Sequence, residues 1–326
     1  GVNVTDGPGV AGSRTPTLQL SSVAYPGANG DYDCIVKTCD GTKSVTSTST
    51  HVTVFGAPPT NHPYLTWGEN SNWQCGNGTN TFKLPPGSYT HLGNVVQMDG
   101  GRSYSVALIS DGSVYTWGNG SFGELGTGAG TAASPVKIGL TNVIQIATGS
   151  THVLALLRDG SIKAWGSNQS GEIGDSSFAQ RNTPVRARVT GCITAIAAGN
   201  NYSLALTSDG TVLSWGSNAL GSLGRGSIGG NSLMPAPVVG LSNVIAIAAG
   251  AYTGFALRGD GTVWAWGYNA FGELGNNTTT NSGTPVQVQG LTQIRSIAGT
   301  QANGYAVSAT GAVYGWGRGG QGAIGD

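Results

Sequence analysis

Residues 209–224 read DGTVLSWGSNALGSLG, and this stretch decides the fold because it recurs along the chain. Trp-Gly pairs stand at successive spacings of 50, 48, 50, 51 and 50 residues, at Trp67, Trp117, Trp165, Trp215, Trp266 and Trp316. Six residues after each of the last five Trp residues comes a Gly-x-Leu/Ile-Gly turn such as Gly221-Ser222-Leu223-Gly224. Self-similarity at a period near 50 residues indicates a repeat architecture through residues 64–326.

Each repeat predicts four short β-strands. Asp-Gly stands between two strand-like runs, as at Asp209-Gly210, and predicts a hairpin with a type I′ turn, in which both central residues have positive φ. A Pro-Val pair, such as Pro184-Val185, begins a further extended segment. Four-stranded sheets that need cover on both faces and repeat every 50 residues favour an all-β propeller, with a flat solenoid as the alternative.

The pattern Asp-Gly-x-Val-x-x-Trp-Gly-x-Asn with Gly-Glu-Leu-Gly, as in Asp260–Gly275, resembles the regulator of chromosome condensation repeat. The resemblance covers residues 64–326 and implies the family's seven-bladed β-propeller. Counted from Tyr64, the chain supplies two strands of a first blade, four full blades and three strands of a last one. We expect seven blades in the full protein, with six as the alternative.

Residues 1–56 lack the repeat and resemble the C-terminal portion of an immunoglobulin-like domain, through Gly30-Asp31-Tyr32-Asp33-Cys34 and the Ser/Thr-rich strand that follows. In that family a Tyr two residues before the Cys hydrogen-bonds to the backbone, so the resemblance gives Tyr32 this structural role. We predict a linker at residues 57–63. A bridge from Cys34 to Cys39, a free Cys34 thiol and a partner upstream of the chain all stay open.

Composition excludes a nucleic-acid binder that depends on charge. Charged residues are 9% of the chain and the formal net charge is zero, so there is no basic surface to pair with a phosphate backbone. We therefore predict no nucleic-acid partner. The longest uncharged stretch, residues 238–257, contains several Gly residues and matches the repeat, so we also predict no membrane span in this segment.

The search for a reactive site finds none. The four Cys residues lack the Cys and His spacing of a zinc site, no Ser-His-Asp set is recognisable, and His152 lies in an apolar strand, where a structural imidazole is expected. The recurring Glu124, Glu172 and Glu273 could ring a pore and bind cations, but we favour hydrogen bonds to their own Gly-rich turns. We predict no catalytic residue, cofactor or metal, and structural roles for these three Glu residues, Tyr32 and the six Trp residues.

Low charge, abundant polar residues and the immunoglobulin-like segment lead us to predict a non-enzymatic bacterial protein of the extracellular space or cell surface. It would be part of an adhesin, stalk or fibre subunit that binds a protein partner or assembles with itself as a homo-oligomer or fibre. The alternative is a secreted propeller that binds or inhibits a protein through loops on one face, such as those with Tyr268 and Phe271 or with Phe122 and Phe178. A carbohydrate-active enzyme would need two facing carboxylates. The family's chromatin-linked exchange factor implies a nucleosome-binding tail and a GTPase-facing wedge, and neither is recognisable.

Overall fold

The computed structural model describes residues 30–32, 35–37, 44–46, 50–52, 64–89, 92–128 and 130–325. The chain divides into two compact units, Gly1–His62 and Pro63–Asp326. In the first unit, β1 (Gly30–Tyr32) pairs antiparallel with β4 (Thr50–Val52), and β2 (Ile35–Lys37) pairs antiparallel with β3 (Ser44–Thr46). The immunoglobulin-like domain stays a prediction, because Cys34, Cys39, the linker and the side chain of Tyr32 lie outside the described part.

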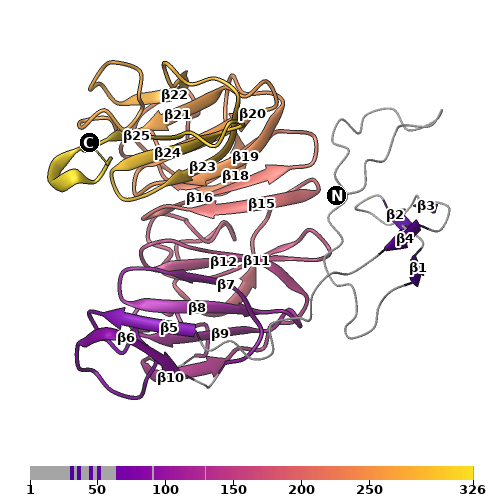
Figure 1. The fold of residues 1–326 in the computed structure, drawn as a ribbon, viewed down its shortest axis with the longest axis vertical. Coiled ribbons are helices and arrows are strands. Elements are labelled where there is room, and N and C mark those ends of the chain that lie inside the picture. The colour runs from indigo at the N-terminus through magenta and orange to yellow at the C-terminus, as the bar shows by residue number, and fades with distance from the viewer. Residues whose placement is uncertain are drawn as a thin grey trace. The chain divides into compact units, whose positions relative to one another are not determined.

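The described residues of the second unit form six antiparallel sheets, which we number in chain order (Figure 1). Sheet 1 holds β5 (Tyr64–Gly68) and β6 (Lys83–Tyr89), and sheet 6 holds β23 (Ile294–Gly299), β24 (Asn303–Ser308) and β25 (Val313–Gly317). A short 3₁₀ helix, η1 (Gly320–Gly322), follows β25. Sheets 2 to 5 have four strands each: β7 (Val95–Gly100), β8 (Tyr104–Ile109), β9 (Val114–Gly118) and β10 (Ala132–Lys137); β11 (Val143–Thr148), β12 (His152–Leu157), β13 (Ile162–Gly166) and β14 (Arg181–Arg186); β15 (Ile193–Ala198), β16 (Tyr202–Thr207), β17 (Val212–Ser217) and β18 (Asn231–Pro237); β19 (Val244–Ala249), β20 (Thr253–Arg258), β21 (Val263–Gly267) and β22 (Ser282–Gln287).

The sheets follow one another round a common axis. The first strands of sheets 2 to 6 contact their neighbours in order, β7 to β11, β15, β19 and β23. The same five strands line a central cavity of about 1080 Å³. A flat solenoid would give no shared cavity, so the predicted all-β propeller is confirmed. The number of blades in the full protein stays a prediction.

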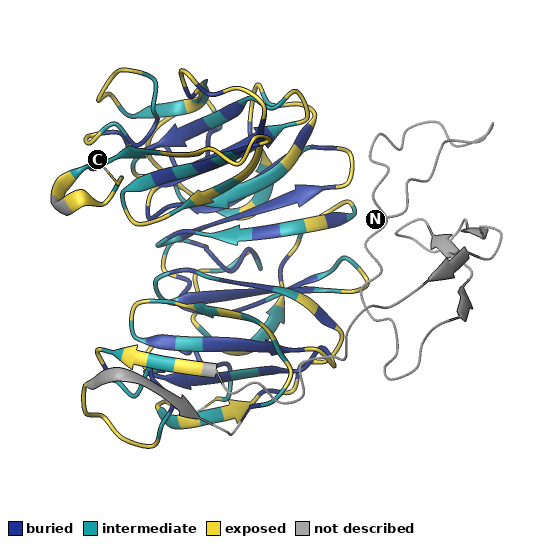
Figure 2. Cartoon of the chain, in the orientation of Figure 1, coloured by how far each residue is buried: buried dark blue, intermediate teal, exposed yellow. Residues whose placement is uncertain are grey.

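The hydrophobic core lies in layers between neighbouring sheets. One cluster joins Leu154 and Leu156 of sheet 3 with Ile196 and Trp215 of sheet 4. The second strands are the most deeply buried, and every residue of β16 is buried (Figure 2). Burial on both faces of a sheet is the reason why these strands are nearly continuous apolar runs.

A tryptophan closes each layer. The indole Nε1 of Trp215 donates a hydrogen bond to the backbone oxygen of Glu172, 2.8 Å away in the turn of the preceding sheet. Gly174 of that turn has φ +73°, and a Cβ there would lie 2.8 Å from the same Nε1, so only glycine fits beneath the indole. The same bond joins four more pairs: Trp117 to Gln74, Trp165 to Glu124, Trp266 to Ser222 and Trp316 to Glu273, at 2.7 to 2.9 Å.

Trp67 departs from this pattern. Its side chain is 63% exposed, whereas Trp117, Trp165, Trp215 and Trp266 are 0% exposed and Trp316 is half-buried. No turn of a preceding sheet lies against Trp67 among the described residues. A repeat tryptophan is therefore buried by its neighbour and not by its own sheet.

The Asp-Gly hairpins form, but the predicted type I′ turn is wrong. Gly112 has φ +80°, whereas Asp111 is absent from the residues with positive φ. The amide of Gly112 donates to the oxygen of Ile109, which closes a type I turn, and Gly112 takes the left-handed position after it. The Asp111 carboxylate accepts hydrogen bonds from the amide and hydroxyl of Ser113, which lower its pKa. The aspartate thus caps the turn and needs no positive φ.

One joint contains a buried histidine. Tyr104 and Tyr202 begin the second strands of sheets 2 and 4, and each phenol donates to a glycine oxygen of the next sheet, 2.9 and 3.1 Å away. In sheet 3 this position is His152, which is 0% exposed. Its Nε2 lies 3.0 Å from Ser203 Oγ, and its Nδ1 has no hydrogen-bond partner. Burial lowers the pKa of His152 to about 4, and the Glu172 carboxylate opposes this shift.

We predict that Trp215→Ala lowers the free energy of unfolding by roughly 3 to 5 kcal/mol, the usual cost of emptying a buried aromatic site. The matched control is Trp67→Ala, which removes the same side chain from an exposed site and should cost less than about 1 kcal/mol. Denaturant titration of both variants measures the two values. Equal losses of stability would contradict the conclusion that the bond from the tryptophan to the turn holds neighbouring sheets together.

His152 also makes stability depend on pH. Its pKa is about 4 when folded and 6.5 in the ordinary state, so between these values the unfolded chain binds the extra proton. Stability should therefore fall by roughly 3 kcal/mol as pH drops from 6.5 to 4. His152→Tyr, which restores the residue of sheets 2 and 4, should remove this part of the pH dependence. Burial raises the pKa values of Asp99 and Glu124, so these two groups make stability rise as pH falls. They do so equally in the unchanged chain and in His152→Tyr. Denaturant titrations at pH 7 and pH 4.5 measure the loss of stability in the unchanged chain and in His152→Tyr. An equal loss in both would refute the role of His152 in the pH dependence.

Candidate protein interface

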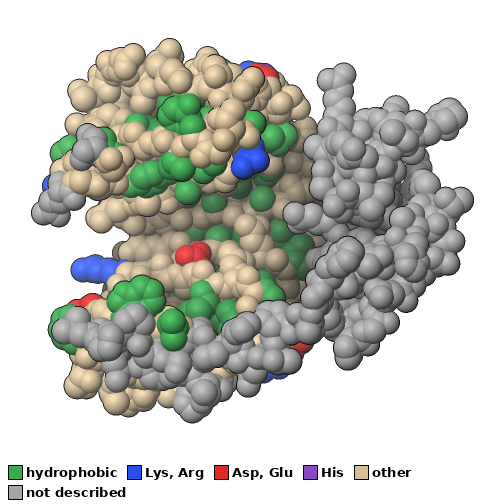
Figure 3. Space-filling view, viewed as in Figure 1, with side chains coloured by type: hydrophobic (Ala, Val, Ile, Leu, Met, Phe, Trp, Pro, Cys, Tyr) green, Lys and Arg blue, Asp and Glu red, His purple; other side chains and the backbone are tan. Residues whose placement is uncertain are grey.

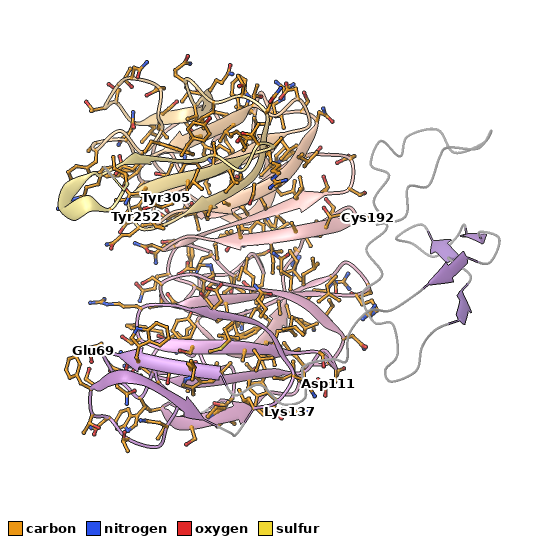
Figure 4. The ribbon with its side chains drawn as sticks, viewed as in Figure 1. Glu69, Asp111, Lys137, Cys192, Tyr252 and Tyr305 are labelled. Atoms are coloured by element: carbon orange, nitrogen blue, oxygen red, sulfur yellow. The ribbon has the colours of Figure 1, made fainter. Side chains whose placement is uncertain are left out.

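The propeller has two chemically different ends. In each four-stranded sheet, the turn between the first and second strands and the long loop between the third and fourth leave at one end, which we call the loop end. Amide-to-carbonyl bonds such as Arg102 to Ser150 and Asn200 to Ala251 join these turns between neighbouring sheets. The Asp-Gly hairpins lie at the opposite end, the hairpin end. Figure 4 shows Tyr252 and Glu69 on one side of the unit and Asp111 on the other.

Buried asparagines hold the long loops of the loop end in shape. Asn269 is 0% exposed, and its amide nitrogen donates to the backbone oxygens of Thr278 and Thr280, each 3.0 Å away. Its Oδ1 accepts a hydrogen bond from the amide of Leu274 at 2.8 Å. The same position, three residues after the repeat Trp, is occupied by Asn70, Asn168 and Asn218, with equivalent bonds.

The Trp-Gly-x-Asn motif contains these asparagines, but the sequence analysis predicted no structural role for them. The signal that could have found them is their fixed offset from Trp-Gly, because a buried amide has to satisfy both its donors and its acceptor. In sheet 2 the position is Gly120, where a Cβ would lie 1.8 Å from the oxygen of Gly130. There the loop backbone itself takes the place of the asparagine.

The recurring glutamates lie inside the turns of the loop end. Oε2 accepts the amide of Phe122 in Glu124, of Ser170 in Glu172 and of Phe271 in Glu273, at 2.7 to 2.8 Å. All three side chains are at most 4% exposed, and none lines the central cavity. Their positions do not form a ring of carboxylates around a pore. Within the described part of the chain, no group of three or more His, Cys, Asp or Glu residues could hold a metal ion.

The central cavity is lined to a large extent by backbone and small side chains. Gln97 bridges sheets 2 and 3 by bonding both the amide and the oxygen of Ile146, and Gln145 does the same to Ile196 of sheet 4. Asp99 accepts the amide of Thr148 at 2.9 Å, and burial raises its pKa. The polar side chains of the cavity thus serve chiefly to join the first strands.

Aromatic side chains are exposed at the loop end. Phe122 is 43% exposed, Phe178 55%, Tyr252 40% and Phe271 46%. They come from sheets 2, 3 and 5, and sheet 4 adds Ile228 at 51%. Figure 3 views the unit from the side, with the loop end toward the left, and shows few charged side chains on the face that it draws. The loop end therefore presents apolar surface on loops that are fixed from beneath.

The clearest cluster of these side chains spans sheets 5 and 6. The rings of Tyr252 and Tyr268 meet edge to face with centroids 6.4 Å apart, and those of Tyr268 and Phe271 do so at 6.3 Å. The guanidinium of Arg318 stacks over Phe271, 4.8 Å from the ring centroid. Tyr268 and Phe271 were singled out by sequence as a possible loop cluster, whereas Tyr252 and Arg318 join them only through the fold.

Comparison with known proteins finds the Regulator of chromosome condensation (RCC1) repeat five times, at residues 65–108, 111–156, 159–206, 209–257 and 260–301. Human WBSCR16 is similar in structure, with 27% sequence identity and a TM-score of 0.68 over 74% of this chain and 66% of that one. Prp20p from Saccharomyces cerevisiae, described with its binding to Gsp1p and histones, has 26% identity and a TM-score of 0.68 over 79% of this chain and 68% of that one. Yeast RCC1 (Prp20) bound to Kap60 has 20% identity, which shows the fold alone, and a TM-score of 0.58 over 82% and 81%.

These relatives contradict the extracellular or cell-surface location that composition led us to expect. The yeast relative binds histones, which package DNA inside the cell. The expectation was wrong because low charge and abundant Asn, Ser, Thr and Gly follow from the turns and loops of the repeat, whatever compartment holds it. The structure contains no helix, among the residues it describes, with the length and apolar character to cross a membrane.

We predict that Asn269→Ala lowers the free energy of unfolding by about 2 to 4 kcal/mol, because it leaves the buried amide of Leu274 and the backbone oxygens of Thr278 and Thr280 without their partner. The control is Thr279→Ala in the same loop, an exposed position whose loss should stay within about 0.5 kcal/mol. Denaturant titration gives both values. If Asn269→Ala behaves like the control, the loop is held by something other than its asparagine.

Proposed function

Because the chain belongs to the regulator of chromosome condensation repeat family, we propose that its propeller is a protein-binding platform whose contact surface is the loop end. The observation that carries this proposal is the set of exposed aromatic side chains on that end. Aromatic residues that stay exposed on rigid loops are typical of protein interfaces, where they supply contact area at little cost in conformational entropy. The yeast relative, which binds Gsp1p and histones, supports a role in protein binding.

The local structure supports the same role. Loops held by buried asparagines lose little freedom on binding, so more of the contact energy is left for affinity. The hairpin end lacks this arrangement, because its turns are short and its Asp carboxylates are occupied by their own Ser or Thr residues. A partner would therefore find exposed aromatic side chains on pre-organised loops at the loop end.

The test removes the aromatic surface without touching the core. Two double variants, Phe122→Ser with Phe178→Ser and Tyr252→Ser with Phe271→Ser, are immobilised beside the unchanged chain and exposed to extract of the source cells. Quantitative mass spectrometry then compares the captured proteins. We expect at least one protein to be captured about tenfold less by one of the pairs, the effect of losing a binding hot spot.

The matched control is Ile144→Ser with Ile245→Ser, which removes two exposed aliphatic side chains, 44% and 47% exposed, from the hairpin end. It should leave capture unchanged. Circular dichroism and thermal unfolding confirm that each variant is folded. Equal capture by all variants, or equal loss in the control, would exclude the loop end as the contact surface.

We propose self-association as the second candidate. The observation that favours it is the exposed apolar side of β5, with Leu65 at 53% and Trp67 at 63% exposed. Light scattering across a range of protein concentrations distinguishes the two, since Leu65→Ser with Trp67→Ser should lower the mass of an assembly but leave capture of a partner intact. The adhesin and fibre roles depended on the extracellular location and are not proposed.

A further inference from the structure

The cluster of Tyr252, Tyr268, Phe271 and Arg318, which we call the aromatic cluster, crosses the joint between sheets 5 and 6. Tyr252 comes from the turn after β19, Tyr268 and Phe271 come from the loop after β21, and Arg318 follows β25. Edge-to-face rings and a stacked guanidinium link all four in one row. Two sheets therefore build this patch together, and neither builds it alone.

The backbone beneath the aromatic cluster is fixed. Asn269 stands between Tyr268 and Phe271 and makes its hydrogen bonds to Thr278, Thr280 and Leu274. The amide of Phe271 donates to Glu273 Oε2 at 2.8 Å. The two rings thus start from anchored backbone, and a partner would not have to order this loop first.

Arg318 forms no ion pair with any residue that the structure describes. Among the residues that the structure describes, ion pairs join only Arg181 to Asp175 and Arg258 to Asp260. The recurring carboxylate of this loop, Glu273, is 1% exposed and accepts a hydrogen bond from its own turn. The exposed guanidinium is held on an aromatic face, where it keeps its capacity to bind a carboxylate.

We propose that the aromatic cluster binds a segment of a partner protein that places one carboxylate beside a large apolar side chain. This deepens the proposed function and rests on it. The apolar side chain packs against Tyr252, Tyr268 and Phe271, and the carboxylate pairs with Arg318. Arg and aromatic residues at the centre of a patch are the usual composition of a binding hot spot.

A carboxylate suits this site better than a phosphate. Phosphorylated segments are recognised by several cations acting together. Arg318 is the single cation of the aromatic cluster, whose other three members are aromatic side chains. One positive charge on an aromatic platform therefore matches one negative charge on an otherwise apolar segment.

The experiment selects ligands from displayed random peptides of about twelve residues on the immobilised full chain, and then measures synthetic copies of the enriched peptides by fluorescence anisotropy. We expect the enriched peptides to carry Asp or Glu close to an aromatic residue or Leu. Arg318→Glu and Phe271→Ala should each weaken binding about tenfold or more. Exchanging the peptide's acid for Lys should restore binding to Arg318→Glu, and binding to the unchanged chain should weaken with added salt.

The matched control is Arg158→Glu, an exposed arginine at the hairpin end, which should change affinity less than about twofold. Peptides that require Phe271 but bind Arg318→Glu as well as the unchanged chain would overturn the carboxylate proposal and leave the loop end standing as the contact surface. Enriched peptides that bind Phe271→Ala as well as the unchanged chain would also overturn the proposal. So would a selection that enriches only basic or neutral sequences, or one that enriches no peptide.

Discussion

The structure depends on one bond repeated at every joint: an indole N–H that reaches across to a backbone oxygen in the turn of the preceding sheet. The acceptor is a backbone group, so the side chain at that position can vary among Gln, Glu and Ser. The indole itself cannot vary, because its ring fills the hydrophobic layer between two sheets and its N–H donates to the backbone oxygen of the turn. The second glycine of the turn is equally fixed, since a Cβ at Gly174 or Gly224 would enter the ring.

The candidate interface is a consequence of the same joint. The turn that receives the indole belongs to the long loop after Trp-Gly, so the loop is anchored at its base by the neighbouring sheet. Asn269 then fixes the rest of the loop from within. With the base and the interior both satisfied, the side chains of Tyr268 and Phe271 take no part in holding the loop and are available for contact. The repeat thus separates residues that hold the sheet from residues that face outward.

Most of the fold could be predicted because its signals are local and periodic. Trp-Gly spacing, Asp-Gly between apolar runs and Pro-Val each recur at fixed offsets, which predicts four strands per sheet. The type of hairpin turn could not be predicted, since Asp111 is held by Ser113 and this bond is not visible in a dipeptide. The exposure of Trp67 was also missed, because burial of a repeat residue depends on a neighbouring sheet. His152 gave only a structural expectation, whereas the fold places it where Tyr104 and Tyr202 stand in other sheets.

The candidate site was predictable only within one loop. Tyr268 and Phe271 are three residues apart, and their sequence suggested a cluster, but Tyr252 and Arg318 come from other strands and join it only when the sheets are side by side. Composition was a poor guide for a related reason. Asn, Ser and Gly occupy the loop positions of this repeat and form its internal hydrogen bonds, so few surface positions carry a charge. This holds in any cellular compartment. Recognition by such a protein must then depend on a few positions where shape and one charge coincide, as they do at Phe271 and Arg318.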